Sequence, residues 1–234
     1  MASTGGSPAA PRAAPGEAAR SVRAAFTATI ALIALYVVLD VIAQLLPPHY
    51  SPIRQPESDL AVGPYGYVMT ANFVVRGVLS LFFLVGLAKG TRLGERSRTG
   101  VALLGVWAVG AFVLAAFPTD VPPTPISGHE WVHIVTALIV FACVAIGEIL
   151  LSRQFDADPH VAPIRTPAIA LSVLALLFAV GFFLGPSRIG GLLERLFLGL
   201  ALGWMLFVAA YYLYCGRHLG GDPGTSSADA SRSA

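Results

Sequence analysis

The sequence predicts an all-α polytopic membrane protein with six transmembrane helices and both termini in the cytoplasm. Of its 234 residues, 56% are hydrophobic and only 12% are charged, which is about half the charged share of a typical soluble domain. A spanning helix needs about 20 mostly apolar residues. Six such stretches follow one another along the chain, at Ala24–Leu46, Tyr67–Ala88, Gly100–Phe117, Glu130–Leu151, Pro167–Gly185 and Leu193–Cys215.

The positions of Lys and Arg predict the orientation of these helices, because basic loops stay in the cytoplasm. With both termini inside, eleven of the fifteen Lys and Arg residues fall on the cytoplasmic side and Arg76 falls within a span. The opposite side receives only Arg54, Arg188 and Arg195. The chain is therefore expected to be a multi-pass protein of the cell membrane.

Three regions are expected along the chain. Residues 1–23 and 216–234 are rich in Ala, Gly, Pro and Ser, and they are predicted to be disordered cytoplasmic tails around a transmembrane domain at 24–215. The first apolar run is longer than the core of a cleaved signal peptide, so it is expected to be a retained anchor. A net charge of +2 without a basic stripe excludes a nucleic-acid partner and leaves membrane lipids as the expected surroundings.

Polar residues gather at the non-cytoplasmic face, where we expect a functional site. The sharpest pattern is His129-Glu130-Trp131-Val132-His133, in which two histidines lie four residues apart on one helix face. Such a pair can bind one metal ion, such as zinc, with the intervening Glu acting on bound water. The same histidines can instead serve as hydrogen-bonding groups, and no downstream motif supplies the third ligand of a zinc peptidase.

Acidic residues from two loops and from the start of the sixth span accompany the histidines. Asp120 follows a proline that ends the third span, and Asp59 lies in the first loop before a Gly-Pro turn. Each is predicted either to complete a metal-ligand set or to remain a solvated or capping loop residue. Glu194 and Arg195 begin the sixth span, where they line the rim of the site or anchor the helix at the interface.

Two charged residues lie within the predicted hydrocarbon, where an unpaired charge is costly. Asp40 and Arg76 lie at similar depths, and Asn72 precedes Arg76 by one helical turn, so the three are expected to form a polar network. The network either locks two helices together or belongs to a substrate pocket. Glu148, near Arg153, is expected to extend toward cytoplasmic water.

Small residues recur at four-residue spacing in the last two spans. Gly181 and Gly185, and Gly199 and Gly203, are predicted to let neighbouring helices approach closely, either within the bundle or at a dimer face. Cys143 and Cys215 fall at mid-span and at a cytoplasmic helix end, so they are expected to remain unpaired.

Several ordered motifs resemble the bacterial and archaeal six-helix membrane family called domain of unknown function nine-nine-eight. They are the run Ser58–Pro64, Asn72, Gly77, Phe117–Asp120, His129, His133, Gly191 and Glu194–Arg195. The resemblance covers about residues 26–214 and implies a six-helix topology but no activity. Glu130 stands where the family has glycine. This difference indicates that the complete zinc-hydrolase pattern arises by chance, and that the two histidines matter more than Glu130.

Two main functional hypotheses follow. In the first, His129, His133, Asp120 and Asp59 hold one divalent metal ion such as zinc, and Asp59, Asp120, Glu194 and Arg195 act in hydrolysis of or group transfer to a lipid or other amphiphile. In the second, the chain binds lipid or supports a partner complex without catalysis. A third hypothesis, proton-coupled transport through Asp40 and Arg76, lacks a polar path toward the cytoplasm.

The predicted orientation can be tested by cysteine labelling at Thr124, in the second non-cytoplasmic connection. In a Cys143→Ala, Cys215→Ala background, Thr124→Cys should react with an impermeant maleimide on intact cells because the loop faces outward. Lys89→Cys, at a predicted cytoplasmic end, serves as control and should react only after lysis. The reverse labelling pattern would invert the orientation.

Overall fold

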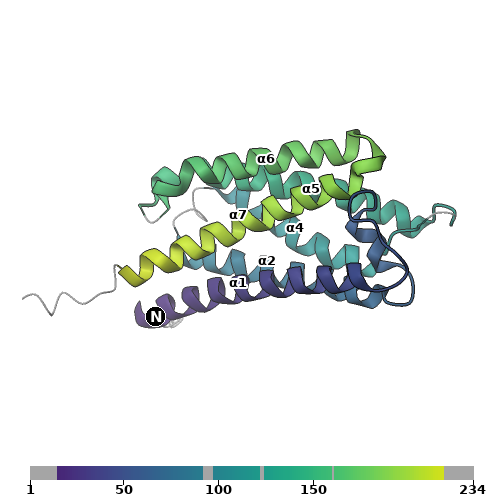
Figure 1. Cartoon of the computed structure of the whole chain (residues 1–234). Helices are drawn as coiled ribbons and strands as arrows, with labels where there is room; N and C mark the ends of the chain where they lie inside the picture. Colours follow the sequence, from purple (N-terminus) through teal and green to yellow (C-terminus); the bar gives the residue numbers. More distant parts are fainter. Residues whose placement is uncertain (1–14, 92–96, 122–123, 160, 219–234) are drawn as a thin grey trace, which may run out of the picture.

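The computed structural model describes residues 15–91, 97–121, 124–159 and 161–218, and these residues form helices and connections without a strand. Element labels follow Figure 1. In chain order the elements are α1 (Pro15–Leu45), η1 (Glu57–Ala61), α2 (Gly66–Gly90), α4 (Arg98–Ala116), α5 (Gly128–Ser152), η2 (Phe155–Ala157), η3 (Ala162–Ile164), α6 (Arg165–Leu184), η4 (Ser187–Ile189) and α7 (Gly190–His218).

Six of these helices are long and apolar enough to cross a bilayer, which confirms the predicted fold class. The chief difference in bounds is α1, which begins at Pro15 and therefore includes residues assigned above to a disordered tail. Glu17 in its first turn favours a helix N-terminus, and the hydroxyl of Ser21 donates a hydrogen bond to the carbonyl of Ala18. The remaining parts of the two predicted tails, 1–14 and 219–234, lie outside the described residues.

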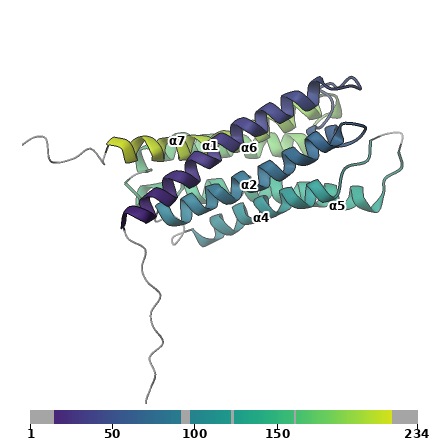
Figure 2. The ribbon, with the colours of Figure 1, turned by 90° about the horizontal axis from the view of Figure 1, so that it is seen from below.

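Consecutive spanning helices pack side by side, and α7 returns to pack against α1, so the bundle closes in chain order. Helix α7 also contacts α2 and α5. Both ends of the described chain lie at the same end of the bundle, on the left of Figure 1. Figure 2 shows the bundle from below, with α1 beside α7 and α2. We call the opposite end, where η1, the α4–α5 connection and η4 lie, the polar end.

Aromatic side chains fill the interior, and their polar atoms are paired. The indole nitrogen of Trp107 donates to the hydroxyl of Ser80 at 3.0 Å, and that of Trp204 donates to Ser152 at 2.9 Å. Both indoles are fully buried. A bilayer offers no water to these groups, so each bond links two helices at a point where an unpaired donor would be costly.

The two glycine pairs behave differently. A side chain at Gly185 would meet Leu193 of α7, so the first pair serves close packing between α6 and α7, as predicted. By contrast, a Cβ atom added to Gly199 or Gly203 would meet nothing within 4 Å. The second pair therefore faces open space, and the expectation that it packs against a neighbouring helix of the bundle is wrong.

Candidate functional site

Arg195 fastens the first loop across the polar end. Its Nη1 donates to the carbonyl oxygens of Pro52, Gln55 and Gly191 at 3.1–3.2 Å, and its Nη2 donates to the hydroxyl of Tyr50 at 2.7 Å. The loop also receives a backbone hydrogen bond from α7, from the amide of Leu192 to the carbonyl of Ile53. The guanidinium predicted to act in catalysis is therefore committed to holding the loop.

Gly191 allows the first loop to approach α7 this closely because it has no side chain. A Cβ atom there would overlap the carbonyl of Gln55 and press on that of Pro52. The first loop can therefore lie directly on the first turn of α7, which positions η1 over the helix ends.

Glu57, the first residue of η1, is buried in the centre of the polar end with 2% of its surface exposed. Its Oε1 accepts a hydrogen bond from the hydroxyl of Tyr36 at 2.6 Å, and its backbone amide donates to Oε2 of Glu194 at 2.5 Å. Its second oxygen, Oε2, has no hydrogen-bond partner among the described residues. The first loop thus contributes a deeply buried carboxyl group to the polar end.

Two carboxylates and two guanidinium groups surround Glu57, from Asp40, Glu194, Arg76 and Arg195. Burial, followed by the nearby carboxylates of Asp40 and Glu194, raises the pKa of Glu57 to about 8, although Arg76 acts in the opposite direction. Burial, followed by the charge of Glu130, raises the pKa of Asp59 to about 6. Glu57 therefore holds its proton to a higher pH than an exposed glutamate does.

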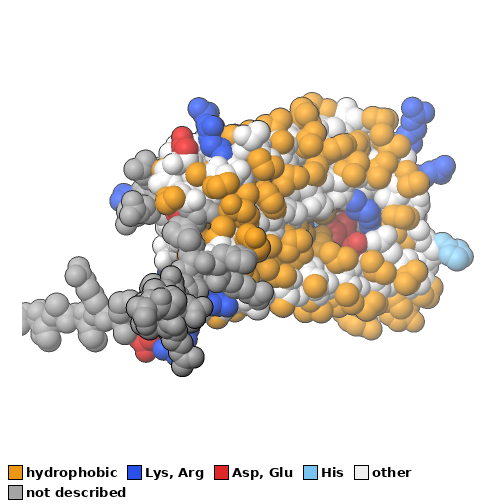
Figure 3. All heavy atoms as spheres, turned by 60° about the vertical axis from the view of Figure 1, so that its left-hand side comes forward, with side chains coloured by type: hydrophobic (Ala, Val, Ile, Leu, Met, Phe, Trp, Pro, Cys, Tyr) orange, Lys and Arg blue, Asp and Glu red, His pale blue; other side chains and the backbone are white. Residues whose placement is uncertain are grey.

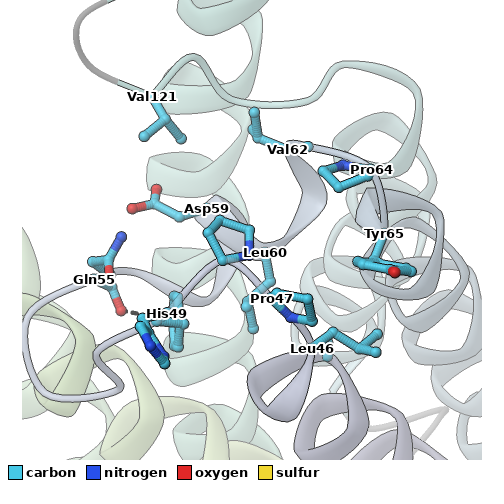
Figure 4. A pocket seen from close by; sticks show the side chains of 14 residues that line it. Leu46, Pro47, His49, Gln55, Asp59, Leu60, Val62, Pro64, Tyr65 and Val121 are labelled. Atoms are coloured by element: carbon cyan, nitrogen blue, oxygen red, sulfur yellow. Dashed lines mark hydrogen bonds between the residues drawn. The ribbon is translucent and has the colours of Figure 1, made fainter.

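Three cavities adjoin these residues. The loop pocket, of about 180 Å³, lies beneath the first loop and is lined by Gln55 and Asp59 among others (Figure 4). The α5–α7 chamber, of about 300 Å³, is lined by polar side chains from two connections and two helices, namely Asp59, Asp120, Glu130, His133 and Glu194. The α1–α7 groove, of about 330 Å³, has Tyr36, Asp40, Glu57 and Arg195 at one end.

Two of the cavities share a lining residue, and a hydrogen bond connects the third to one of them. Asp59 borders both the loop pocket and the α5–α7 chamber. Glu194 borders the chamber, and Glu57, which donates its amide proton to Glu194, borders the groove. The Glu57–Glu194 contact therefore separates two cavities that each hold carboxyl groups.

The α5–α7 chamber brings together most of the predicted site. Asp59, Asp120, His133 and Glu194 all line it, although they come from distant parts of the chain. Nδ1 of His133 lies 2.7 Å from the carbonyl oxygen of Phe117, so Nδ1 carries the proton and Nε2 keeps the lone pair of the neutral ring. His129 does not line the chamber: it is exposed, and its ring packs edge-on against Phe117.

A closed set of hydrogen bonds stabilises the α4–α5 connection. Glu130 accepts from the hydroxyl of Thr119 at 2.7 Å and from the amide of Asp120 at 2.6 Å. Asp120 in turn accepts from the amide of Ser127, whose hydroxyl caps α5 by accepting from the amide of Glu130. These bonds from Ser127 lower the pKa of Asp120. Both carboxylates therefore have clear structural tasks.

The geometry does not support the predicted metal centre at His129, His133, Asp120 and Asp59. In the described part of the chain, no three His, Cys, Asp or Glu side chains are grouped so that they could hold a metal ion. The physical reason is that the expected ligands have other contacts. His129 faces outward, and Asp120 accepts a hydrogen bond from the backbone of its own connection.

The predicted network of Asp40, Asn72 and Arg76 is also absent from the described residues. The guanidinium of Arg76, 1% exposed, lies 5.0 Å from the ring of Phe73 and 4.6 Å from that of Trp107. Asp40 instead accepts from the amide nitrogen of Gln44 at 2.6 Å. Although Asp40 and Arg76 lie at similar depths on α1 and α2, their charges do not pair. The guanidinium of Arg76 packs against aromatic rings instead.

Sequence reasoning missed three polar residues. Tyr36 lies one helical turn before Asp40 on the same face of α1, which is a signal that the sequence contained. Glu57 lies in a polar loop segment of the sequence, and only the fold shows that it is buried. Glu148 does not extend to water: it is fully buried and both of its oxygens lack a partner among the described residues.

Comparison with known proteins identifies the family. The model of the family described as "Protein of unknown function (DUF998)" matches residues 12–211. No curated protein and no solved structure matches the chain.

Raising the pH should lower the thermal stability of the protein in detergent micelles. In the folded state the pKa of Asp59 is raised from 3.8 to about 6, and that of Glu57 from 4.5 to about 8. Because the folded protein holds these protons more tightly than the unfolded chain, its stability falls as the pH rises through this range. Glu57→Gln, which mimics the protonated carboxyl, should flatten most of the fall in a Tm series. Glu17→Gln, at an exposed site, is the control, and an identical slope in both variants would contradict the assignment.

Chelation should leave the Tm of the purified protein unchanged, because the candidate donors are separated or bonded to their own backbone. Elemental analysis of the same sample should find no stoichiometric zinc. A Tm that drops with chelator and recovers with zinc would restore the metal hypothesis.

Proposed function

Because this chain belongs to the DUF998 membrane family, whose description assigns no activity, we propose a function from its own geometry: it binds an amphiphile of the bilayer. The polar headgroup lies at the polar end and the apolar chain lies in the α1–α7 groove. The observation that carries this proposal is the groove itself, since it joins an apolar trough to buried carboxyl groups.

The groove lies on the lipid-facing surface. The neighbouring surface of α1 exposes large apolar side chains, among them Leu35, Val37 and Val38, as expected for a helix against lipid. Figure 3 shows acidic and basic side chains together in an otherwise hydrophobic face. A charged cluster in such surroundings is costly unless it is covered or occupied.

The dimensions suit an acyl chain. Apolar side chains line the groove from Leu198 to Leu206, and Gly199 and Gly203 leave it open. The distance along α7 from Arg195 to Leu206 is about 16 Å at a rise of 1.5 Å per residue. That is close to the thickness of one hydrocarbon leaflet, about 15 Å. A lipid-like chain could therefore lie in the groove with its headgroup beside Asp40 and Glu57.

Hydrolysis or group transfer on the same amphiphile is the second candidate. The α5–α7 chamber favours it, because Nε2 of His133 and the carboxyls of Asp59 and Glu194 line one cavity, and such groups act in general acid–base catalysis. The metal-dependent form is not proposed. Proton-coupled transport is not proposed either, because the sequence offers it no polar path toward the cytoplasm.

Filling the groove tests the binding proposal. Gly203→Leu places a side chain in the open space of the groove, so it should displace the amphiphile without disturbing the fold. Native mass spectrometry of the full chain purified in mild detergent should show one retained amphiphile per wild-type chain and about tenfold less in the variant, the effect of losing about 1.4 kcal/mol of binding.

Gly105→Leu is the matched control. Gly105 lies on α4, and a Cβ there also meets nothing within 4 Å, but it lines a separate apolar hollow between α4 and α5. This variant should retain the amphiphile at the wild-type level. Equal retention in both variants, or none in the wild type, would refute binding in the groove.

A further inference from the structure

We propose that the carboxyl groups of Asp40 and Glu57 form a proton-binding site, in which one shared proton holds the first loop against α1. We call these two groups the acid pair. The site is present whether or not the groove holds an amphiphile, so it goes beyond the proposed function. The partners of the four carboxyl oxygens lead to this assignment.

Each carboxyl group of the acid pair uses one oxygen for a neutral donor. The hydroxyl of Tyr36 donates to Oε1 of Glu57 at 2.6 Å, and the amide nitrogen of Gln44 donates to Oδ2 of Asp40 at 2.6 Å. The other two oxygens, Oε2 of Glu57 and Oδ1 of Asp40, are buried and receive no hydrogen bond from another group of the described residues. The two carboxyl groups are instead hydrogen-bonded to each other.

A hydrogen bond between two carboxyl groups requires a proton. An ionised carboxylate has acceptors only, so two carboxylates in contact have nothing to donate. A protonated carboxyl group has one O–H, which the neighbouring carboxylate can accept. One proton therefore pairs the acid pair internally and removes one of two adjacent negative charges. Without it, two buried acceptors would remain unpaired, which is costly away from water.

The surroundings of the acid pair balance this arrangement. The charged or titratable groups that face it come from two helices besides α1 and from the first loop, and they are Tyr36, Tyr50, Arg76, Glu194 and Arg195. With one proton on the pair, two carboxylates remain beside two guanidinium groups, and their charges cancel. Loss of the proton would add a negative charge to a buried cluster that is otherwise neutral.

Glu57 is the carrier of the shared proton. Burial, followed by the charges of Asp40 and Glu194, raises the pKa of Glu57 to about 8, although Arg76 opposes the shift. Glu57 then donates its O–H to Asp40, whose carboxylate also faces Arg195. Because the two carboxyl groups are in contact, their titration belongs to the pair, and a change at either residue should alter it.

The shared proton links η1 to the helices. Glu57 is the buried residue of η1, and both of its side-chain oxygens are directed to α1, one to Tyr36 and one to Asp40. Its backbone amide donates to Glu194 on α7. Loss of the proton replaces one of these hydrogen bonds by repulsion between two carboxylates in contact. We therefore expect η1, which lies between the groove and the chamber, to loosen.

Hydrogen exchange of residues 57–62 tests this expectation in the full chain in nonionic detergent. The amides of Glu57, Asp59 and Val62 donate hydrogen bonds in the folded loop, so their protection reports its opening. The folded loop holds the proton of Glu57 up to about pH 8, whereas a released loop does not. Protection, relative to the intrinsic exchange rate, should therefore fall about tenfold between pH 7 and pH 9.

Two conservative variants replace the shared proton by an amide. In Glu57→Gln the new N–H group can donate to Asp40, and in Asp40→Asn it can donate to an ionised Glu57. Protection in both should stay within about twofold between pH 7 and pH 9. Glu17→Gln, an exposed carboxyl of α1, is the control and should show the wild-type fall. A fall that persists in Asp40→Asn would mean that Glu57 titrates alone, and the shared proton would be refuted.

Infrared difference spectra of the wild type cover the case in which a variant folds poorly. Between pH 7 and pH 9 the C=O band of protonated carboxyl groups should lose intensity, and an unchanged band would refute the proposal. Gly203→Leu separates this site from the proposed function. It should keep the wild-type pH response even where it abolishes amphiphile binding, because the acid pair needs no ligand in the groove. Loss of the pH response in Gly203→Leu would contradict an independent proton site.

Discussion

The polar end depends on one interaction, the set of hydrogen bonds from Arg195 to the first loop. Those bonds hold the carbonyls of Pro52 and Gln55 against the first turn of α7, where Gly191 leaves room for them. With the loop fixed there, η1 carries Glu57 into the bundle and places Asp59 between two cavities. Arg195, expected at the rim of an active site, is thus the residue that holds the polar end together.

A lipid-facing bundle must satisfy its polar groups internally, and this chain does so unevenly. The two interior tryptophans pair with serine hydroxyls, and the α4–α5 connection closes its own hydrogen bonds. At the head of the α1–α7 groove, by contrast, the carboxyl groups of Asp40 and Glu57 lie next to each other, and the charge of Asp40 disfavours a negative charge on Glu57. The polar groups there are therefore less evenly paired than those around the two tryptophans.

The sequence was sufficient for the fold because runs of about 20 apolar residues have few alternatives in a membrane. It also identified Asp59, Asp120, His133 and Glu194, which meet at one chamber, since their loops all lie at one end of the bundle. It could not show that Glu57 is buried, because burial of a loop residue depends on contacts with a distant helix. It also could not decide whether Gly199 and Gly203 face a helix or lipid, because spacing is the same in both cases.

The placement of Glu194 and Arg195 on the last of the six helices has a consequence for biosynthesis. Chains emerge from the ribosome starting at the N-terminus, so the first loop is made long before α7. Until α7 inserts, that loop has no guanidinium to anchor it, and the amide of Glu57 has no carboxylate to receive its hydrogen bond. A nascent chain with five helices therefore lacks the hydrogen bonds that fix the first loop, and the polar end is completed only when the last helix inserts.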